Sequence, residues 1–283
     1  MHFTKLEALG NDFLLVESRD VPDASDLAVL SRQMCCRNLG AGADGILVLS
    51  PPDTSDSDVA TRIFNADGSE AEVSGNGTRC VAAYLDGLGR WPAEGVDLRV
   101  ATSAGVKRLR RLGESLFQME MGIPTFRSGD VPFTGRAADE LAVDVALDVS
   151  GRAWTVTVAS IGNPHCSIFV DDPDAIDWRS VGAAIETHPA FPNRVNVEFI
   201  RVTSRNEIDV RFWERGVGET QSSGTGATAA TVAAIATGRV DRSVSVRTAA
   251  GNLSVSWPDD QASVFLVGPA RSVYRGEWLL PIG

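Results

Sequence analysis

The chain has 283 residues, 43% hydrophobic and 22% charged, as in a soluble globular protein with one large domain or two of ordinary size. Its net charge of −11 argues against nucleic acid or an anionic membrane surface as a partner. Because the N-terminus shows no secretory signal and no segment is apolar enough to span lipid, we predict a cytoplasmic protein.

Short strands bounded by glycine, proline, aspartate or asparagine are predicted along the whole chain. In chain order they cover residues 13–17, 45–49, 98–101, 116–121, 155–159, 167–170, 196–202, 207–213 and 243–247. Apolar spacing predicts a helix over 26–36. Two more helices, over 78–88 and 225–237, follow glycine-rich turns and end before Gly89 and Gly238. Both are rich in alanine and almost free of charge, so we expect them to be buried on most faces.

The two glycine-rich turns are nearly the same sequence, VSGNGT at 73–78 and SSGTGA at 222–227. Their serines, Ser74 and Ser223, lie 149 positions apart. Two other landmarks recur in the same order, since 10–13 resembles 162–165 and 64–70 aligns with 213–219. The chain therefore reads as an internal duplication.

This organisation predicts an α+β fold with two pseudo-equivalent domains. Each domain is expected to be a mixed or antiparallel sheet wrapped around one central buried helix, with the active site in the cleft between the domains. The N-terminal domain is predicted over 1–120, with a C-terminal tail of about 268–283 packing back on it, and the C-terminal domain over 121–267.

The chemistry of the turns follows from helix ends. A glycine-rich loop that enters a helix presents free backbone N–H groups and the positive end of the helix dipole, which suits a carboxylate. A carbanion beside that carboxylate would be stabilised as well. With Ser74 and Ser223 on opposite sides of a substrate, one side could remove a proton and the other return one, which inverts a stereocentre. The alternative is that each turn only allows close packing of a helix on a strand.

Other motifs fit poorly. Gly224-x-Gly226-x-x-Ala229 formally matches a dinucleotide fingerprint, but the polar segment 218–223 precedes it in place of a strand. There is no phosphate-binding P-loop and no Gly-x-Ser-x-Gly elbow. Three histidines without ligand spacing predict no metal, and we expect no cofactor. The four cysteines, Cys35, Cys36, Cys80 and Cys166, are expected to be reduced and buried.

Six ordered motifs together resemble the diaminopimelate epimerase family, over residues 3 to about 275. They are ALGNDF (8–13), NADGSE (65–70), GNGTRC (75–80), GNPH (162–165), NRVN (193–196) and WERGVGET (213–220). The resemblance implies a homodimeric amino-acid epimerase that needs no pyridoxal phosphate, with two similar domains. Such an enzyme interconverts LL- and meso-diaminopimelate, an amino-acid substrate on the bacterial route to lysine and cell wall.

The resemblance also assigns residues. It implies catalytic roles for Ser74 and Ser223, which stand where the family has cysteines, and tuning roles for His165 and Glu214. Substrate binding is implied for Asn11, Asn65, Asn163 and Asn196, for Glu214 and Arg215 at the distal groups, and for Gly75, Asn76, Gly224 and Thr225 at the reacting carboxylate. Taken alone, the asparagines could be turn residues and Glu214–Arg215 a surface pair.

The two serines are the departure from the family pattern. A thiol titrates near pH 8.5 and can act as a thiolate base, whereas a serine hydroxyl needs a neighbouring base. Three alternatives stay open. The serines could be engineered replacements, or they could be natural, with His165 or Glu214 activating a hydroxyl. Otherwise the protein is a related isomerase or dehydratase acting on another small amino or hydroxy acid, or a small-ligand binder without catalysis.

Overall fold

The computed structural model describes residues 1–22, 26–52 and 54–279. It divides into two compact units, which are described separately below. The first consists of Met1–Met119 together with the C-terminal segment that starts at Val267, and the second is Glu120–Leu266.

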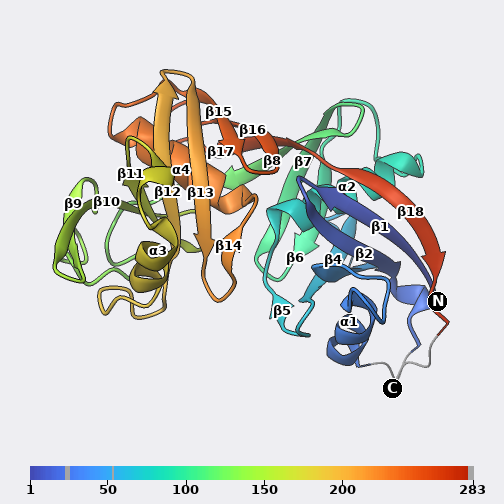
Figure 1. The fold of residues 1–283 in the computed structure, drawn as a ribbon. Helices are drawn as coiled ribbons and strands as arrows, with labels where there is room; N and C mark the ends of the chain where they lie inside the picture. Colours follow the sequence, from blue (N-terminus) through green and yellow to red (C-terminus); the bar gives the residue numbers. More distant parts are fainter. Residues whose placement is uncertain (23–25, 53, 280–283) are drawn as a thin grey trace. The chain divides into compact units, whose positions relative to one another are not determined.

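The N-terminal unit is a mixed sheet with two α-helices, α1 (Leu27–Cys35) and α2 (Gly75–Gly87). Its sheet runs in the order β18-β1-β2-β3-β4-β6-β7-β8, and the pairs β2–β3 and β4–β6 are parallel. Helix α2 packs against β1, β2, β3, β7 and β18 (Figure 1). The strands are β1 (His2–Ala8), β2 (Asn11–Glu17), β3 (Gly45–Ser50), β4 (Val59–Asn65), β5 (Glu70–Ala71), β6 (Leu98–Thr102), β7 (Gly105–Gly113), β8 (Leu116–Gly122) and β18 (Arg271–Glu277), with a 3-10 turn η1 (Ser18–Asp20).

The C-terminal unit repeats this plan with α3 (Trp178–Glu186) and α4 (Gly224–Ala236). Its sheet runs β9-β10-β11-β12-β13-β15-β16, and the pairs β11–β12 and β13–β15 are parallel. The strands are β9 (Val145–Val149), β10 (Arg152–Ser160), β11 (Pro164–Phe169), β12 (Asn196–Ser204), β13 (Glu207–Glu214), β14 (Gly218–Thr220), β15 (Ser243–Thr248), β16 (Gly251–Ser256) and β17 (Val264–Pro269), with a 3-10 turn η2 (Pro173–Ala175).

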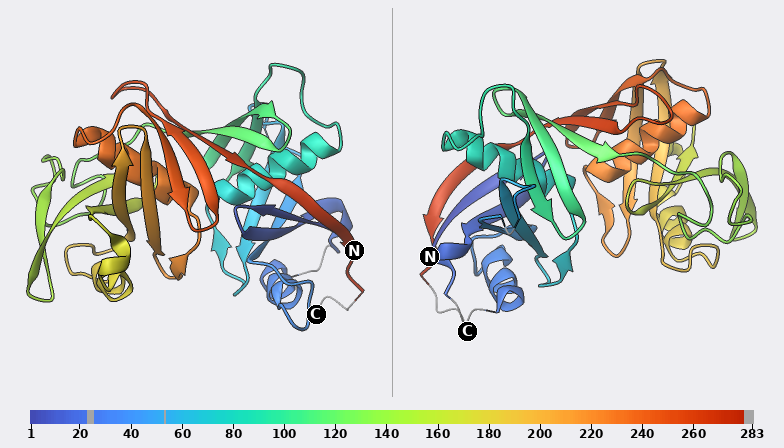
Figure 2. Two further views of the ribbon diagram at one scale, coloured as in Figure 1. Left: turned by 45° about the horizontal axis from the view of Figure 1, so that its top comes forward. Right: turned by 180° about the vertical axis from the view of Figure 1, so that it is seen from behind.

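The two units have the same order of strand pairings. Strands β1-β2-β3-β4-β6-β7 correspond to β10-β11-β12-β13-β15-β16, with parallel pairs at the same two places. Small strands β5 and β14 each pair with the strand before them. Within its own unit, each of α2 and α4 packs against several strands of the sheet (Figure 2). The predicted duplication and α+β class are confirmed.

Helices α2 and α4 begin earlier than the sequence predicted, because the serines cap them. The Ser74 hydroxyl accepts from the Gly77 N–H at 3.0 Å, and the Ser223 hydroxyl accepts from the Gly226 N–H at 3.2 Å. These are N-cap hydrogen bonds. The predicted glycine ends are confirmed, with φ of 65° at Gly89 and 69° at Gly238.

Both helices are buried at most positions, as predicted, although only α4 is free of charged residues. The third residue of each, Gly77 or Gly226, is glycine because the helix approaches a strand closely. A Cβ on Gly226 would lie 2.7 Å from Cδ1 of Phe212, and one on Gly77 would lie 3.1 Å from Cδ2 of Leu47. The close-packing alternative is therefore true of both turns, and it does not exclude a binding role.

Three predictions need correction or addition. The four cysteines are free, but Cys36 is only partly buried, because it follows α1 at its C-terminal end. Helix α3 was missed, although it buries Trp178, Gly182, Ile185 and Glu186 on one face. Nine strands were also missed: β1, β4, β5, β7, β9, β14, β16, β17 and β18. Of these, β7 has an arginine-rich sequence that alternates weakly, and it is largely exposed. In the described part of the chain, the helices are too short or too polar to cross a membrane.

Replacing Gly226 by alanine should destabilise the protein by about 1–3 kcal/mol, because the added methyl overlaps a buried aromatic ring that cannot move freely. The free energy of unfolding in urea measures this loss. Gly87→Ala is the matched control, since a Cβ there meets nothing within 4 Å. Equal stability of Gly226→Ala and Gly87→Ala would contradict the close approach.

Candidate active site

In the N-terminal unit, the start of α2 presents backbone donors that lack acceptors. The Ser74 side chain and carbonyl accept from Gly77 and Thr78, respectively. In the part of the chain that the structure describes, nothing accepts from the N–H groups of Gly75 and Asn76, although both residues are buried. Buried N–H groups require an acceptor, so this turn can bind an anion.

A directed chain of hydrogen bonds holds two predicted binding asparagines beside this turn. Arg79 donates to Oδ1 of Asn76 at 2.6 Å, Asn76 Nδ2 donates to Oδ1 of Asn11 at 3.2 Å, and Asn11 Nδ2 donates to Asp44 at 2.7 Å. A guanidinium can only donate and a carboxylate can only accept, so the two ends fix both amide orientations. Each asparagine keeps one unused N–H donor.

Arg79 is fully buried, and burial lowers its pKa to about 10. The guanidinium therefore stays charged at neutral pH. Its Nη1 has no partner among the described residues, and its other contacts are Asn76 and, at 3.5 Å, the Pro269 carbonyl. A buried cation paired with no carboxylate adds to the positive potential at the start of α2.

The series of hydrogen bonds ends at Asp44, which is held by a cluster of ion pairs. Arg37 bridges Asp12 at 3.1 Å and Asp44 at 2.8 Å, and Lys5 pairs with Asp12 at 2.6 Å. The two cations hold the pKa of Asp12 below its usual value, although partial burial opposes them. The cluster fixes Asp44, and through it Asn11.

Asn65 takes no part in this series of hydrogen bonds. It is exposed at the end of β4, where its Nδ2 donates to the Ser69 hydroxyl at 2.9 Å. Its backbone pairs with Gly45, next to Asp44. The structure thus links Ser74, Gly75, Asn76 and Asn11 but does not hydrogen-bond Asn65 to them.

In the C-terminal unit, α4 begins in the same way. The Ser223 hydroxyl caps Gly226, and the Ser223 carbonyl accepts from Ala227 at 2.9 Å. Within the described residues, the N–H groups of Gly224 and Thr225 have no acceptor. This start of α4 can therefore bind an anion in the same way as the start of α2.

A carboxyl group lies beside Ser223. Thr220 donates to Glu214 Oε1 at 2.6 Å. Burial raises the pKa of Glu214 above its ordinary value, while hydrogen bonds from the Thr220 and Ser223 hydroxyls and the charge of His165 oppose the rise. A buried carboxyl with a raised pKa beside a hydroxyl is a candidate to accept a proton from it.

His165 connects two further groups. Its Nδ1 lies 2.6 Å from Glu198 Oε1, and its Nε2 lies 2.9 Å from Asn163 Oδ1. His165 and Glu198 are both buried, with side-chain exposures of 0% and 1%. Burial raises the pKa of Glu198, and the neighbouring His165 partly offsets that rise.

Asn196 is held between β11 and the turn after β13. Its Nδ2 donates to the Pro164 carbonyl at 2.9 Å, and its Oδ1 accepts from the Arg215 N–H at 3.0 Å. The exposed Arg215 guanidinium donates to the Asn193 carbonyl at 3.2 Å. Among the described residues Glu214 and Arg215 form no ion pair with each other, so the surface-pair alternative fails.

Four residues of these half-sites were not predicted: Asp44, Arg79, Glu198 and Thr220. Arg79 is part of the GNGTRC motif and Thr220 ends WERGVGET, so the motifs contained both. Asp44 comes just before β3, and Glu198 is the third residue of β12, the strand that corresponds to β3. Only their contacts show that each anchors a binding asparagine.

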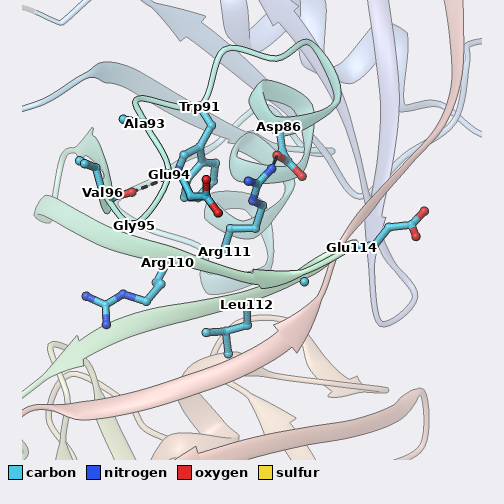
Figure 3. A pocket seen from close by; sticks show the side chains of 11 residues that line it. Asp86, Trp91, Ala93, Glu94, Gly95, Val96, Arg110, Arg111, Leu112 and Glu114 are labelled. Atoms are coloured by element: carbon cyan, nitrogen blue, oxygen red, sulfur yellow. Dashed lines mark hydrogen bonds and ion pairs between the residues drawn. The ribbon is translucent and has the colours of Figure 1, made fainter.

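A surface pocket of the N-terminal unit lies elsewhere, between the 91–96 loop and β7 (Figure 3). Its cations are already paired, Arg111 with Asp86 at 2.6 Å and Arg110 with Asp97 at 2.8 Å. No predicted site residue lines it. We therefore place the candidate site at the helix starts.

Comparison with known families decides the assignment of the chain. The model of the family described as diaminopimelate epimerase matches residues 3–126 and 157–273. The chain belongs to the diaminopimelate epimerase family. Among its relatives, the diaminopimelate epimerase of Pelotomaculum thermopropionicum is 44% identical over 98% of this chain and 99% of its own. That of Moorella thermoacetica is 43% identical over 99% and 100%, respectively.

Solved structures share the fold at low identity. A probable proline racemase from Agrobacterium radiobacter superposes with a TM-score of 0.71 at 15% identity, covering 99% of this chain and 93% of that one. A hydroxyproline epimerase from Agrobacterium vitis gives 0.70 at 16% identity, covering 98% and 91%. These likenesses show the two-unit α+β fold.

Glu214→Gln should make the protein more stable relative to wild type as the pH rises from about 4 to about 8. A carboxyl whose pKa is raised on folding contributes stability at low pH, and that contribution is lost as the pH rises through the folded-state value. Glutamine does not ionise, so the variant avoids the loss. Urea unfolding at both pH values measures the difference, with the exposed Glu72→Gln as control. A difference that is independent of pH would contradict the raised pKa.

Proposed function

We propose that this chain interconverts LL- and meso-diaminopimelate by exchanging the α-proton at one stereocentre. Membership of the diaminopimelate epimerase family and 40–44% identity to curated epimerases over nearly the whole chain support the reaction. The sites are proposed from the half-site geometry.

The observation that carries the proposal is the set of unused donors. Both helix starts offer two backbone N–H groups without acceptors among the described residues. Beside them, Asn11 and Asn76 have engaged amide oxygens and retain N–H groups, and so does Asn196. Asn163 has its oxygen engaged by His165. A lining of donors suits a ligand that carries carboxylates, and diaminopimelate has two.

We assign the base to the C-terminal half-site. As Ser223 Oγ takes the α-proton, its own proton passes to the adjacent Glu214 carboxylate, so no free alkoxide forms. The negative charge that develops on the α-carbon and its carboxylate is stabilised by the helix-start N–H groups. Glu214 thereby supplies the basicity that a cysteine thiolate supplies by itself.

We assign the acid to the N-terminal half-site. Ser74 accepts from Gly77 and keeps its hydroxyl proton free to donate to the carbanion. Water then reprotonates Ser74. The buried charge of Arg79 and the N–H groups of Gly75 and Asn76 favour the transient anion on this serine. Protonation from the opposite side to removal gives inversion.

We also propose that the enzyme needs no pyridoxal phosphate, is cytoplasmic and forms a homodimer. The chain has two lysines: Lys5 is paired with Asp12 in the ion-pair cluster, and Lys107 lies in β7, so we propose that neither holds pyridoxal phosphate. Four free thiols suit a reducing cytoplasm. A homodimer is supported by β18, which is exposed at most positions and carries Val273 and Tyr274 at 54% and 43% exposure. Light scattering that gives a single-chain mass would refute the dimer.

The test of function is isotope exchange. LL-Diaminopimelate incubated with the protein in deuterated water should gain deuterium at the α-carbon and yield the meso form, followed by NMR. The double change Ser74→Cys, Ser223→Cys should raise the rate about 100-fold or more, because a thiolate is a far better base at neutral pH. The buried neighbour Ser222→Cys is the matched control and should give no increase.

Each other outcome is informative. If neither wild type nor the double variant exchanges the α-proton, the epimerase proposal is refuted. Tight binding of diaminopimelate without exchange, even after the double change, would identify a binder. Turnover of a hydroxy or unsaturated acid but not of diaminopimelate would identify a related isomerase or dehydratase.

A further inference from the structure

The pair His165–Glu198 is buried beneath the C-terminal half-site. Strands β11 and β12 run parallel with Ser167 opposite Glu198, so the carboxyl of Glu198 lies beside the imidazole. Its two oxygens lie 2.6 Å from His165 Nδ1 and 3.3 Å from the Ser167 hydroxyl. No family motif in the sequence includes Glu198, and the mechanism above does not use it.

The hydrogen bonds fix where protons sit on the imidazole. The Asn163 amide oxygen, 2.9 Å from Nε2, can only accept, so Nε2 carries a proton. At 2.6 Å, Nδ1 and the Glu198 carboxyl cannot face each other with lone pairs alone, so a second proton lies between them. The pair therefore holds one proton more than a neutral imidazole beside a free carboxylate.

We propose that Glu198 is a positioning residue that keeps His165 protonated at Nε2 and thereby turns the Asn163 amide N–H groups toward the substrate carboxylate. This inference deepens the proposed function and rests on it only for the identity of the ligand. Without the Glu198 carboxyl, the imidazole holds one proton instead of two and divides between its Nδ1–H and Nε2–H tautomers. In the Nδ1–H tautomer the bare Nε2 would accept from Asn163 Nδ2, the amide would reverse, and its oxygen would oppose the carboxylate.

In the N-terminal unit, too, a carboxylate orients the asparagine, but it does so without an imidazole between them. Asn11, which corresponds to Asn163 in the repeat, is oriented by the carboxylate of Asp44. Asp44 acts directly on Asn11, whereas Glu198 acts on Asn163 through an imidazole. That two units of different sequence each place a carboxylate behind this asparagine supports a positioning role for Glu198.

Two substitutions of Glu198 separate its hydrogen bond to His165 from its negative charge. Glu198→Met fills the space but offers no partner to Nδ1, and should raise KM for diaminopimelate about tenfold with a smaller change in kcat, since the Asn163 donors are lost. Glu198→Gln should restore KM to within about twofold of wild type, because an amide N–H can donate to Nδ1. Ser167→Ala removes only the other hydrogen bond of Glu198 and should leave KM unchanged.

A second readout is independent of activity. The ¹⁵N shifts of the His165 ring, assigned with variants of His2 and His188, should show a protonated Nε2 in wild type and in Glu198→Gln, and an unprotonated fraction in Glu198→Met. An unprotonated Nε2 in wild type, or an unchanged KM and Nε2 signal in Glu198→Met, would overturn the inference. If wild type shows no exchange but the ring shifts behave as stated, the proposed function fails and the positioning role stands.

Discussion

The structure of each half-site depends on one hydrogen bond, from the third N–H of a buried helix to the serine that precedes it. This bond seats the serine at the N-cap and occupies the N–H of Gly77 or Gly226. The two N–H groups before it remain without acceptors among the described residues, and a glycine at the third position lets the helix press on its strand. Packing and anion binding thus have the same cause, since the tight turn that buries the helix also exposes its donors.

The two units share this turn but differ in the charges behind it. The N-terminal half-site has a buried cation, Arg79, whose charge is matched by no carboxylate in the described residues. The C-terminal half-site has two carboxyls with raised pKa values, Glu214 and Glu198, around one imidazole. A hydroxyl beside a cation is the better acid, and a hydroxyl beside a carboxylate is the better base. This asymmetry is the basis on which we propose Ser74 as the acid and Ser223 as the base.

Repetition made much of the fold predictable. The matched turns and landmarks predicted two similar units and their two buried helices, and the serine caps explain why those helices begin at Gly75 and Gly224. Helix α3 was not predicted, although one face of it is buried as in α1. Arg79 and Glu198 reach their roles through burial beneath other elements, and local sequence gives no sign that a charged residue is buried. The site residues implied by the family resemblance stay predictions until they are tested by ligand binding.

The central proposal is that the unpaired amides of each helix start bind a carboxylate of the substrate. Backbone ¹⁵N–¹H shifts during titration with LL-diaminopimelate test it most directly. The amides of Gly75, Asn76, Gly224 and Thr225 should all shift downfield with the same affinity, as expected for new hydrogen bonds to carboxylate oxygens. Shifts confined to one helix start, or none at either, would contradict the account.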